Sequence, residues 1–459
     1  MRTAFAVLAA LSLPQPPSSG AAAQTPDHQT PDHQAPDHQA ADLQAADGAR
    51  LLVLIDGDMA ATAYANGVLH PVAGASDRLV PLALPLEPSP ASDPAPGAGA
   101  PVGIAVSNTV MGWPGSMTVS ADGARAYVVT SKGTPPAGTE RYDSVYTGMP
   151  DARTLTTVDL RAGAATESEA CDRPMAVDIA PSGGWLLAAC ADGPELAVVP
   201  LTDGRPGAPR LLDLDAPDPG EGEPRASFAA IHPGGAAAGV VLGNTRVALV
   251  RFALGPDGVP VSAEMEAPTR TDRWLSVARW TPSGRHLIVA DVGWGPKPTD
   301  AVFNGRGALV SFAMSPDDAV RGEASVARVS KSPEGFALSP DGALAVAVNM
   351  ERTYLPGGWM RVFRGRNASS VSLVAVGADG TLETIGEPTP FRGVLPEDAA
   401  FLPDGRVAVA VYQDHDAPRS GGWVAVFAIE SEGASRRLVE TGTRVDLPRG
   451  AHDLIVAGR

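Results

Sequence analysis

The sequence is poor in cysteine, aromatic residues and long hydrophobic runs. Only 2 of its 459 residues are Cys, and Phe, Trp and Tyr together make up 5%. An apolar stretch near the N-terminus, Ala4 to Leu13, is too short to span a bilayer. Basic residues are outnumbered as well, because 35 Lys and Arg stand against 52 Asp and Glu and leave a net charge of −17. This acidic balance argues against nucleic acid and anionic membrane surfaces as partners.

Common catalytic motifs are missing too. The chain contains no Gly-x-Ser-x-Gly, no His-Glu-x-x-His, no phosphate-binding glycine loop and no Cys-x-x-Cys. An enzyme with this sequence would therefore rely on a metal ion or on general acid and base groups.

What the sequence does contain is a repeated turn. Six copies of a four-residue turn end in glycine, and five of them carry Pro two residues before it; they end at Gly123, Gly183, Gly235, Gly284, Gly342 and Gly405. Pro presets φ at the first corner, Asp or Ser can bond the local backbone, and Gly accepts positive φ. Each turn is preceded and followed by a short, mostly apolar run, which predicts a β-hairpin.

The turn glycines lie 49 to 63 residues apart, so each period must hold more than one hairpin. Two further strand-like runs follow each hairpin, and no helical periodicity is present. Four short antiparallel strands per repeat are typical of a blade of a β-propeller. The sequence therefore predicts an all-β fold with four-stranded blades.

The number of blades follows from the ends of the chain. A seventh copy starts at Pro448 but ends after one strand, whereas Leu51–Ile55, Ala60–Ala65 and Leu79–Leu86 resemble strands without a repeat of their own. We expect the last strand to pair with these first ones, closing a seven-bladed ring and removing exposed sheet edges. The propeller would span residues 50–459 as one domain.

Residues 1–49 read differently from the rest. Residues 1–23 combine Arg2, an apolar stretch and three alanines, as in a secretory signal peptide, although a disordered alanine-rich start fits as well. Residues 24–49 carry repeats of Pro-Asp-His-Gln, which predict a disordered tether whose histidines could bind a metal ion weakly. The signal peptide predicts a periplasmic or secreted protein.

The two cysteines, Cys171 and Cys190, flank the first strand pair of one blade. In an exported protein they could form a disulfide. Two free thiols remain an alternative, because the hairpin register places Cys190 nearer Met175 than Cys171.

Polar residues gather where the first strand of each repeat begins, at the expected mouth of the central channel. Carboxylates and a histidine there could act as acid or base groups or hold a divalent ion, and arginines could hold an anionic ligand. The first set is Glu334, Glu397, Asp398 and His452; the second is Arg173, Arg273 with Trp274, and Arg449. The alternative is that these charges neutralise each other as ion pairs between blades.

Long loops after the second strands are expected on the same face, where binding groups often lie. Their polar and aromatic members nearest the strand ends are Asn349, Tyr354, Asp414 and His415. A solvated rim without a ligand fits these residues equally well.

The Ser-Pro-Asp-Gly hairpins, with a proline nine residues before the glycine at Pro114, Pro174, Pro333 and Pro396, resemble the lactonase-like and YVTN-type seven-bladed propellers, which include 6-phosphogluconolactonase. The shared residues build turns and packing, so the resemblance specifies the fold rather than the activity. In lactonases of this kind, acid, His and Arg residues at the channel mouth act on a cyclic ester.

Two functional hypotheses follow. The first is an exported, monomeric propeller that binds a small molecule or a protein at the channel mouth without turnover. The second is a lactonase-like hydrolase in which Glu334, Glu397 and Asp398 hold Ca, Mg, Mn or Zn, or act with His452 as acid and base groups.

Overall fold

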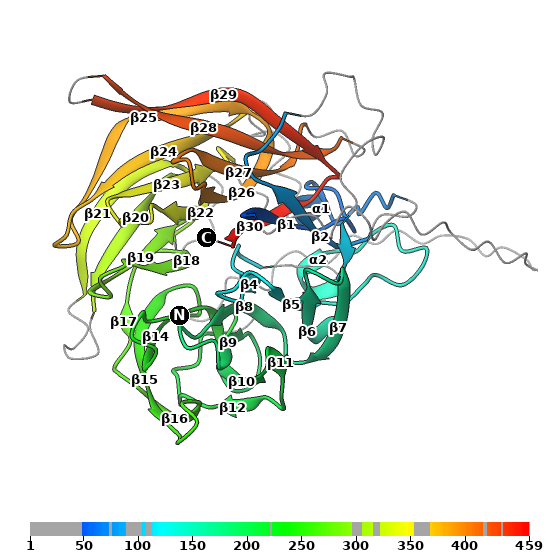
Figure 1. Ribbon diagram of the computed structural model, residues 1–459, viewed down its shortest axis with the longest axis vertical. Helices are drawn as coiled ribbons and strands as arrows, with labels where there is room; N and C mark the ends of the chain where they lie inside the picture. Colours follow the sequence, from blue (N-terminus) through cyan, green and yellow to red (C-terminus); the bar gives the residue numbers. More distant parts are fainter. Residues whose placement is uncertain are drawn as a thin grey trace, which may run out of the picture. The chain divides into compact units, whose positions relative to one another are not determined.

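A computed structural model of the protein describes residues 48–72, 76–88, 103–106, 112–220, 223–295, 305–314, 322–352, 368–415, 420–432 and 435–458. These residues form seven antiparallel sheets, which Figure 1 shows as a ring. The predicted all-β, seven-bladed propeller is thus confirmed. The proposed signal peptide, and the tether except for its last two residues, lie outside the described residues. In the described part of the chain, no helix has the length and apolar character needed to cross a membrane.

Six of the sheets follow the chain from the channel outwards. The first sheet contains β4 (Met117–Val119), β5 (Arg125–Lys132), β6 (Asp151–Asp159) and β7 (Ala164–Glu169). The second contains β8 (Pro174–Ile179), β9 (Trp185–Cys190) and β10 (Leu196–Thr202), and β11 (Arg205–Pro206) and β12 (Arg210–Leu212) both pair with β10. The third contains β13 (Ala226–Ile231), β14 (Ala237–Leu242), β15 (Arg246–Leu254) and β16 (Pro260–Met265), and β17 (Thr269–Arg270) pairs with β15. The fourth sheet contains β18 (Leu275–Trp280), β19 (His286–Asp291), β20 (Arg306–Ala313) and β21 (Glu323–Lys331). The fifth contains β22 (Pro333–Leu338), β23 (Leu344–Asn349), β24 (Ala368–Val376) and β25 (Leu382–Arg392). The sixth contains β26 (Val394–Phe401), β27 (Val407–Gln413), β28 (Gly422–Glu432) and β29 (Ser435–Leu447).

The seventh sheet joins the two ends of the propeller, as predicted. Its innermost strand is β30 (Ala451–Ala457), followed outwards by β1 (Arg50–Ile55), β2 (Arg78–Ala83) and β3 (Ile104–Ala105). Leu52 of β1 pairs with Ile455 of β30, so the last strand of the chain is held by the first. One expectation was wrong: Ala60–Ala65 is not a strand, because the chain turns there into α1 (Ala63–Asn66), which ends at Gly67 in the left-handed conformation.

The repeated turns adopt the expected chemistry. In the turn Ser339 to Gly342, the backbone N–H of Gly342 donates to the Ser339 carbonyl at 2.8 Å, and the Ala343 N–H donates to the Asp341 carboxylate at 3.0 Å. Gly342 has φ of 70°, a conformation that disfavours residues with a side chain. The turn therefore needs both an acceptor at Asp341 and a glycine after it.

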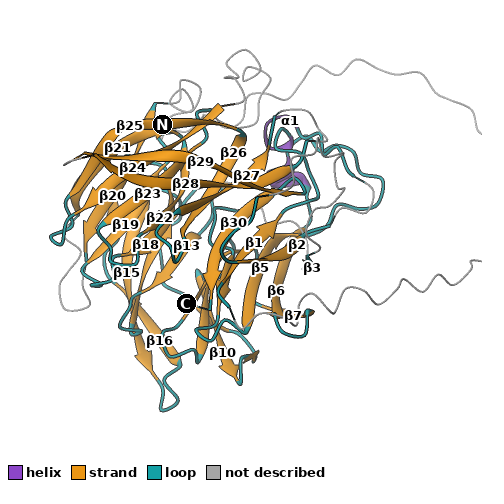
Figure 2. Cartoon of the chain, turned by 45° about the horizontal axis from the view of Figure 1, so that its top comes forward, coloured by secondary structure: helices purple, strands orange, loops and turns teal. Residues whose placement is uncertain are grey.

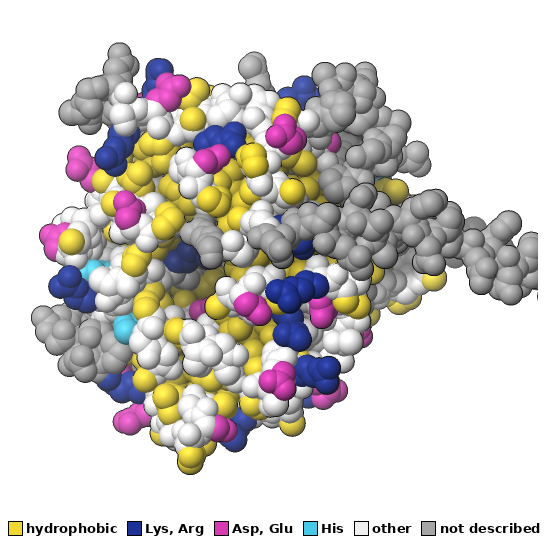
Figure 3. All heavy atoms as spheres, viewed as in Figure 1, with side chains coloured by type: hydrophobic (Ala, Val, Ile, Leu, Met, Phe, Trp, Pro, Cys, Tyr) yellow, Lys and Arg dark blue, Asp and Glu magenta, His cyan; other side chains and the backbone are white. Residues whose placement is uncertain are grey.

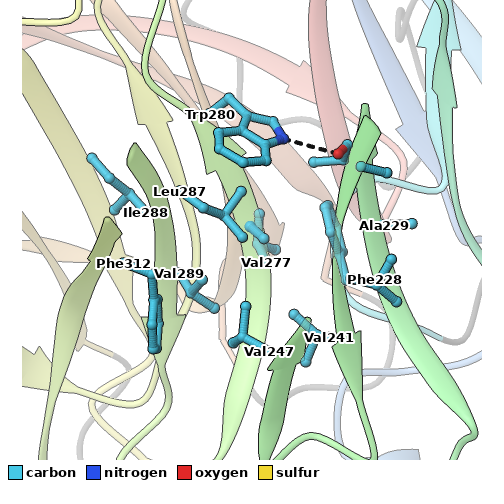
Figure 4. Packing of buried hydrophobic residues seen from close by; sticks show 14 of the residues in the cluster. Phe228, Ala229, Val241, Val247, Val277, Trp280, Leu287, Ile288, Val289 and Phe312 are labelled. Carbon is cyan, nitrogen blue, oxygen red and sulfur yellow. Dashed lines mark hydrogen bonds between the residues drawn. The ribbon is translucent and has the colours of Figure 1, made fainter. Parts of the chain in front are cut away.

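Apolar side chains of neighbouring sheets fill the space between blades. Figure 4 shows Phe228 and Val241 of one blade facing Val277 and Leu287 of the next. The Trp280 indole N–H crosses the same gap and donates to the Ala230 carbonyl at 2.9 Å. Packing and this hydrogen bond together fix how the innermost strands approach the channel.

Candidate functional site

The predicted carboxylates and histidine lie at the N-terminal ends of three innermost strands. Glu334, Glu397 and His452 each sit where the pairing register shifts, between Pro333 and Phe336, between Pro396 and Ala399, and between the partners of Leu54 and Ile55. Such a bulge adds a residue to one strand and re-aims its side chain. The same irregularity thus turns these three side chains away from ordinary strand positions.

His452 and Glu397 form a buried pair across neighbouring blades. The His452 Nδ1 hydrogen-bonds to Oε2 of Glu397, and the two residues are 0% and 2% exposed. Burial lowers the pKa of His452, but the charge of Glu397 and its hydrogen bond outweigh burial and raise the pKa to about 9. At neutral pH the imidazole is therefore protonated, and its second nitrogen, Nε2, is a donor.

Three more buried carboxylates belong to this region. Asp56 follows β1 directly, Asp77 precedes β2, and Glu334 is the second residue of β22. Asp56 and Glu334 interact electrostatically with the pair, and Asp77 interacts with Asp56. Burial and the neighbouring Asp58 raise the pKa of Asp56 to about 8. Burial raises the pKa of Glu334 well above its usual range, and the charge of Glu397 adds to this effect. We call Asp56, Asp77, Glu334, Glu397 and His452 the carboxylate–histidine cluster.

Polar atoms of this cluster lack protein partners. Among the described residues, both carboxylate oxygens of Asp56, one oxygen each of Asp77 and Glu334, and Nε2 of His452 are buried without a hydrogen bond. Asp77 uses its other oxygen to accept the Gly57 N–H at 2.9 Å. Buried polar groups in proteins are nearly always hydrogen-bonded, so this concentration is unusual.

An apolar cap covers the cluster. It consists of the buried residues Met59, Ala61, Ala63, Tyr64, Leu69, Val145, Met149, Val292, Trp294, Met350, Val394, Leu395 and Tyr412. Two of its segments carry α1 and α2 (Val145–Gly148), both labelled in Figure 1. Figure 2 shows α1 among loops at one end of the sheets. The expected open channel mouth is therefore covered, since Glu334 at this end is only 8% exposed.

Tyrosines of the cap reach towards the carboxylates. The Tyr412 hydroxyl donates to the Met59 carbonyl at 2.9 Å and so ties β27 to the segment after β1. The ring of Tyr146 packs against that of Tyr64, a member of the cap, with centroids 5.9 Å apart. Because Tyr146 is 39% exposed, it connects the cap with the surface.

The predicted arginines do not converge on one ligand position. Arg173 pairs with Asp192 at 2.5 Å, and Arg273 pairs with Asp291 and Glu323, each at 2.9 Å. These ion pairs lie within single blades, not between blades. Arg449 alone joins the buried region, where its guanidinium donates to the carbonyls of Gly57 at 3.3 Å and Asp58 at 3.4 Å.

The other predicted binding residues are dispersed. Trp274 packs against Trp294 with ring centroids 6.3 Å apart, and Asn349 donates to Ser370 and Ser372. Asp414 pairs with Arg392 at 2.8 Å and lies 3.9 Å from His415. Tyr354 lies outside the described residues.

Asp398 faces away from its neighbour Glu397. Its Oδ1 accepts from Arg279 at 3.2 Å, and its Oδ2 accepts the Leu454 N–H at 3.3 Å. Glu334, Glu397 and Asp398 thus do not share one point, and no three His, Cys, Asp or Glu residues in the described ranges are placed to hold a metal ion. The structure therefore does not bring Asp398 together with Glu334 and Glu397.

The two cysteines are joined. Cys171 and Cys190 form a disulfide with their Cα atoms 6.1 Å apart. The strand register argued against a disulfide, and it does place Pro174 rather than Cys171 opposite Cys190. The segment before β8 nevertheless turns back far enough for the bond to form. Of the two alternatives, the disulfide is confirmed.

The channel has a second feature at its other end. A cavity of about 500 Å³ is lined by all seven innermost strands, including Phe228, Trp280, Leu338, Phe401, Leu454 and Arg279. Figure 3 shows a hollow near the middle of this face with hydrophobic side chains around it. We call it the lower cavity.

Several of these residues were missed in the sequence. Asp56 could have been found, because it follows a buried strand directly, as Asp414 does among the residues identified in the long loops after second strands. Asp77 and Tyr146 carry no such signal, since they lie in the segments between strands. Arg279 lies in a predicted first strand whose channel-facing positions were not identified.

Comparison with known proteins agrees with this architecture. No family model matches the sequence, and no curated protein matches it. The solved structures similar to this chain include the periplasmic gluconolactonase of Pseudomonas aeruginosa, with 17% identity, 89% of this chain and 99% of that chain covered, and a TM-score of 0.55. A proposed 6-phosphogluconolactonase from Bacteroides fragilis matches with 14% identity, 89% and 98% coverage and a TM-score of 0.54.

A protein of unknown function from Desulfotomaculum acetoxidans is similar to the same extent, with 10% identity, 89% of this chain and 98% of that chain covered, and a TM-score of 0.53. At such low identities the likeness shows the fold alone. The predicted resemblance to lactonase-like propellers is thereby confirmed for the fold.

Proposed function

We propose that the protein is an exported propeller that binds a neutral, hydroxyl-rich small molecule at the carboxylate–histidine cluster. The observation that carries this proposal is the set of buried polar atoms without partners on Asp56, Asp77, Glu334 and His452. Each such atom costs about 1–3 kcal/mol when left unsatisfied. A ligand that bonds to them recovers this free energy and gains affinity from it.

The chemistry of the cluster selects the ligand class. The raised pKa values of Asp56 and Glu334 keep their carboxyl groups largely protonated at neutral pH, so these groups can both donate hydrogen bonds to hydroxyl groups and accept them. The protonated His452 can donate one to an oxygen of the ligand. An anionic ligand is disfavoured, because Arg173 and Arg273 are engaged in ion pairs elsewhere and Arg449 donates to the carbonyls of Gly57 and Asp58. Sugars and sugar lactones have the required mixture of donors and acceptors.

Hydrolysis of a cyclic ester is the second candidate, and the His452–Glu397 pair favours it. An ionised carboxylate of the cluster would take a proton from water while the water oxygen adds to the ester carbonyl carbon, and His452 Nε2–H would donate to the carbonyl oxygen. The ring C–O bond then breaks, and the carboxyl proton passes to the leaving ring oxygen. The pKa values of Asp56 and His452, about 8 and about 9, suit such proton transfers near neutral pH. A gluconolactonase among the structural neighbours supports this candidate.

The test compares a lactone with a cyclic polyol that cannot be hydrolysed. Calorimetric titration of the protein with 1,5-anhydroglucitol, and a titrimetric assay with D-glucono-1,5-lactone, should be run on the protein and on Glu397→Gln. Glu387→Gln, an exposed glutamate of β25, is the matched control. Polyol binding that weakens in Glu397→Gln alone supports binding at the cluster, and lactone turnover lost in the same variant supports the hydrolase. Equal behaviour of all three proteins contradicts both.

Export is a separate part of the proposal. Arg2, the apolar stretch Ala4 to Leu13 and the alanines Ala21 to Ala23 support a cleaved signal peptide. The Cys171–Cys190 disulfide agrees with an oxidising compartment. N-terminal sequencing of the protein purified from its native host should begin after residue 23, and an N-terminus at Met1 would contradict export by this route.

A further inference from the structure

The lower cavity is separate from the carboxylate–histidine cluster. Between the two lies a layer of hydrogen bonds: Asp398 accepts the Leu454 N–H at 3.3 Å, and Asp453 accepts the N–H groups of Gly115 at 2.9 Å and Met117 at 3.0 Å. These carboxylates tie three innermost strands together across the channel. A molecule in the lower cavity therefore does not contact the cluster.

Most residues that line the lower cavity are apolar, but its accessible wall is about equally polar and apolar, and the cavity is of a useful size. Its volume of about 500 Å³ lies within the range of small-molecule sites, and Phe228, Trp280 and Phe401 contribute aromatic surface. Small residues such as Ala278 and Ala337 stand at other positions of the wall. Short side chains on the innermost strands thus leave room that larger ones would fill.

Arg279, a charged residue of the wall, has N–H donors beyond those that bond to the protein. Arg279 uses Nε to donate to the Phe336 carbonyl at 2.7 Å and one terminal nitrogen to donate to Asp398 at 3.2 Å, yet its side chain is 33% exposed. A guanidinium has five N–H donors in a planar fork, so others remain for a ligand. The backbone carbonyl and Asp398 also hold the fork in place before a ligand arrives.

The other charged residue of the wall, Asp178, is already occupied. Its Oδ2 accepts the Ile231 N–H and its Oδ1 accepts the Ile179 N–H, both at 2.8 Å. These bonds tie β8 to β13 and fix the carboxylate against the backbone. The group at the cavity wall best placed to recognise a ligand is therefore the Arg279 cation.

We propose that the lower cavity is a binding site for an amphipathic monoanion, a molecule with one aromatic ring system or a short alkyl chain and one carboxylate or sulfonate group. The anionic group pairs with Arg279, and the apolar part lies against Phe228, Trp280 and Phe401. Two oxygens of a carboxylate or a sulfonate match the fork of a guanidinium, and the pair is stronger inside the cavity than in bulk water. This site does not depend on the function proposed for the cluster.

The test uses 8-anilinonaphthalene-1-sulfonate as a fluorescent probe, with decanoate and decanol as competitors. The folded full-length chain should bind the probe saturably with 1:1 stoichiometry, and decanoate should displace it at a concentration at least tenfold lower than decanol does. This comparison needs no variant and tests the anionic requirement directly. Absence of saturable binding, or equal competition by decanol, would overturn the proposal.

Variants then locate the site. Arg279→Gln should weaken decanoate binding about tenfold or more and leave decanol competition unchanged, whereas Arg279→Lys should retain part of the affinity. Arg285→Gln, an exposed arginine in the turn after the same strand, is the matched control. Glu397→Gln should not change probe binding, which distinguishes this site from the cluster. Unchanged decanoate affinity in folded Arg279→Gln would refute the assignment.

Discussion

His452 on β30 hydrogen-bonds through Nδ1 to Oε2 of Glu397 on β26, and both residues are buried. β30 belongs to the sheet that joins the two ends of the propeller, and β26 belongs to the neighbouring blade. The pair that dominates the candidate site therefore also spans the junction at which the ring closes. Changes at this pair should affect both the ionisation of the site and the stability of the closed ring.

The first prediction concerns the ionisation of His452. In Glu397→Gln the negative charge and the strong acceptor are lost, so burial is opposed only by the charges of Asp453 and Asp56, and the pKa of His452 falls from about 9. NMR titration of the histidine resonances measures this fall. Urea unfolding should show a loss of about 3–5 kcal/mol, because one partner of a buried pair is removed. Glu387→Gln should change neither quantity.

A second prediction follows from Asp56. Its folded pKa of about 8 lies above the unfolded value of 3.8, so its contribution to stability is complete below pH 4 and is lost as the pH rises to 8. Asp56→Asn removes this titration, and the variant should gain stability relative to the natural protein by up to about 5 kcal/mol between pH 4 and 9. Melting temperatures of both proteins at pH 5, 7 and 9 measure the difference. A difference that does not vary with pH would contradict the assignment, and Glu383→Gln serves as an exposed control.

The repeated turn is the sequence feature that predicts the fold, whereas the apolar cap determines how the candidate site is covered. The six turn glycines all have φ between 65° and 82°, so the local chemistry of Pro, Asp or Ser, and Gly is enough to predict each hairpin. Glu397 was found because Pro396, nine residues before Gly405, fixes where a first strand begins, and His452 because Pro448 starts a seventh copy. Their covering was not predictable from the repeat, because α1 and α2 lie in segments that occur once. The same holds for the pairing of Arg173 with Asp192, which depends on loop conformation rather than on strand register.

The disulfide gives a third prediction. Cys171 and Cys190 are 19 residues apart in the sequence. A disulfide that closes a loop of this length raises the free energy of unfolding by about 3 kcal/mol, because it lowers the conformational entropy of the unfolded chain. The double variant Cys171→Ser, Cys190→Ser should lose about that much stability in urea. Treatment of the natural protein with dithiothreitol should reproduce the loss but leave the variant unchanged. Equal stability of the oxidised and reduced protein would show that the bond constrains little.

The fourth prediction distinguishes backbone strain at a glycine from a steric clash of an added Cβ, at the point where the ring closes. Gly450 precedes β30, has φ of 101°, and a Cβ placed on it would lie 1.7 Å from the Asp56 carbonyl oxygen. Its own carbonyl accepts the Asp56 N–H at 2.8 Å, so the close approach cannot relax without breaking this bond. Gly450→Ala should therefore displace both β30 and Asp56, lower stability by about 4 kcal/mol or more, and weaken ligand binding at the cluster.

Gly442 provides the control for this change. It has φ of 76°, but a Cβ there would meet no atom within 4 Å. Gly442→Ala should thus cost only the left-handed backbone strain, about 1–2 kcal/mol, and leave ligand binding unchanged. Urea unfolding and calorimetry on both variants measure the two effects. If the two substitutions cost the same, the contact between Gly450 and Asp56 is not what holds the last strand against the first. A larger loss at Gly450 together with weaker binding would instead show that ring closure and the position of the Asp56 carboxylate depend on the same few atoms.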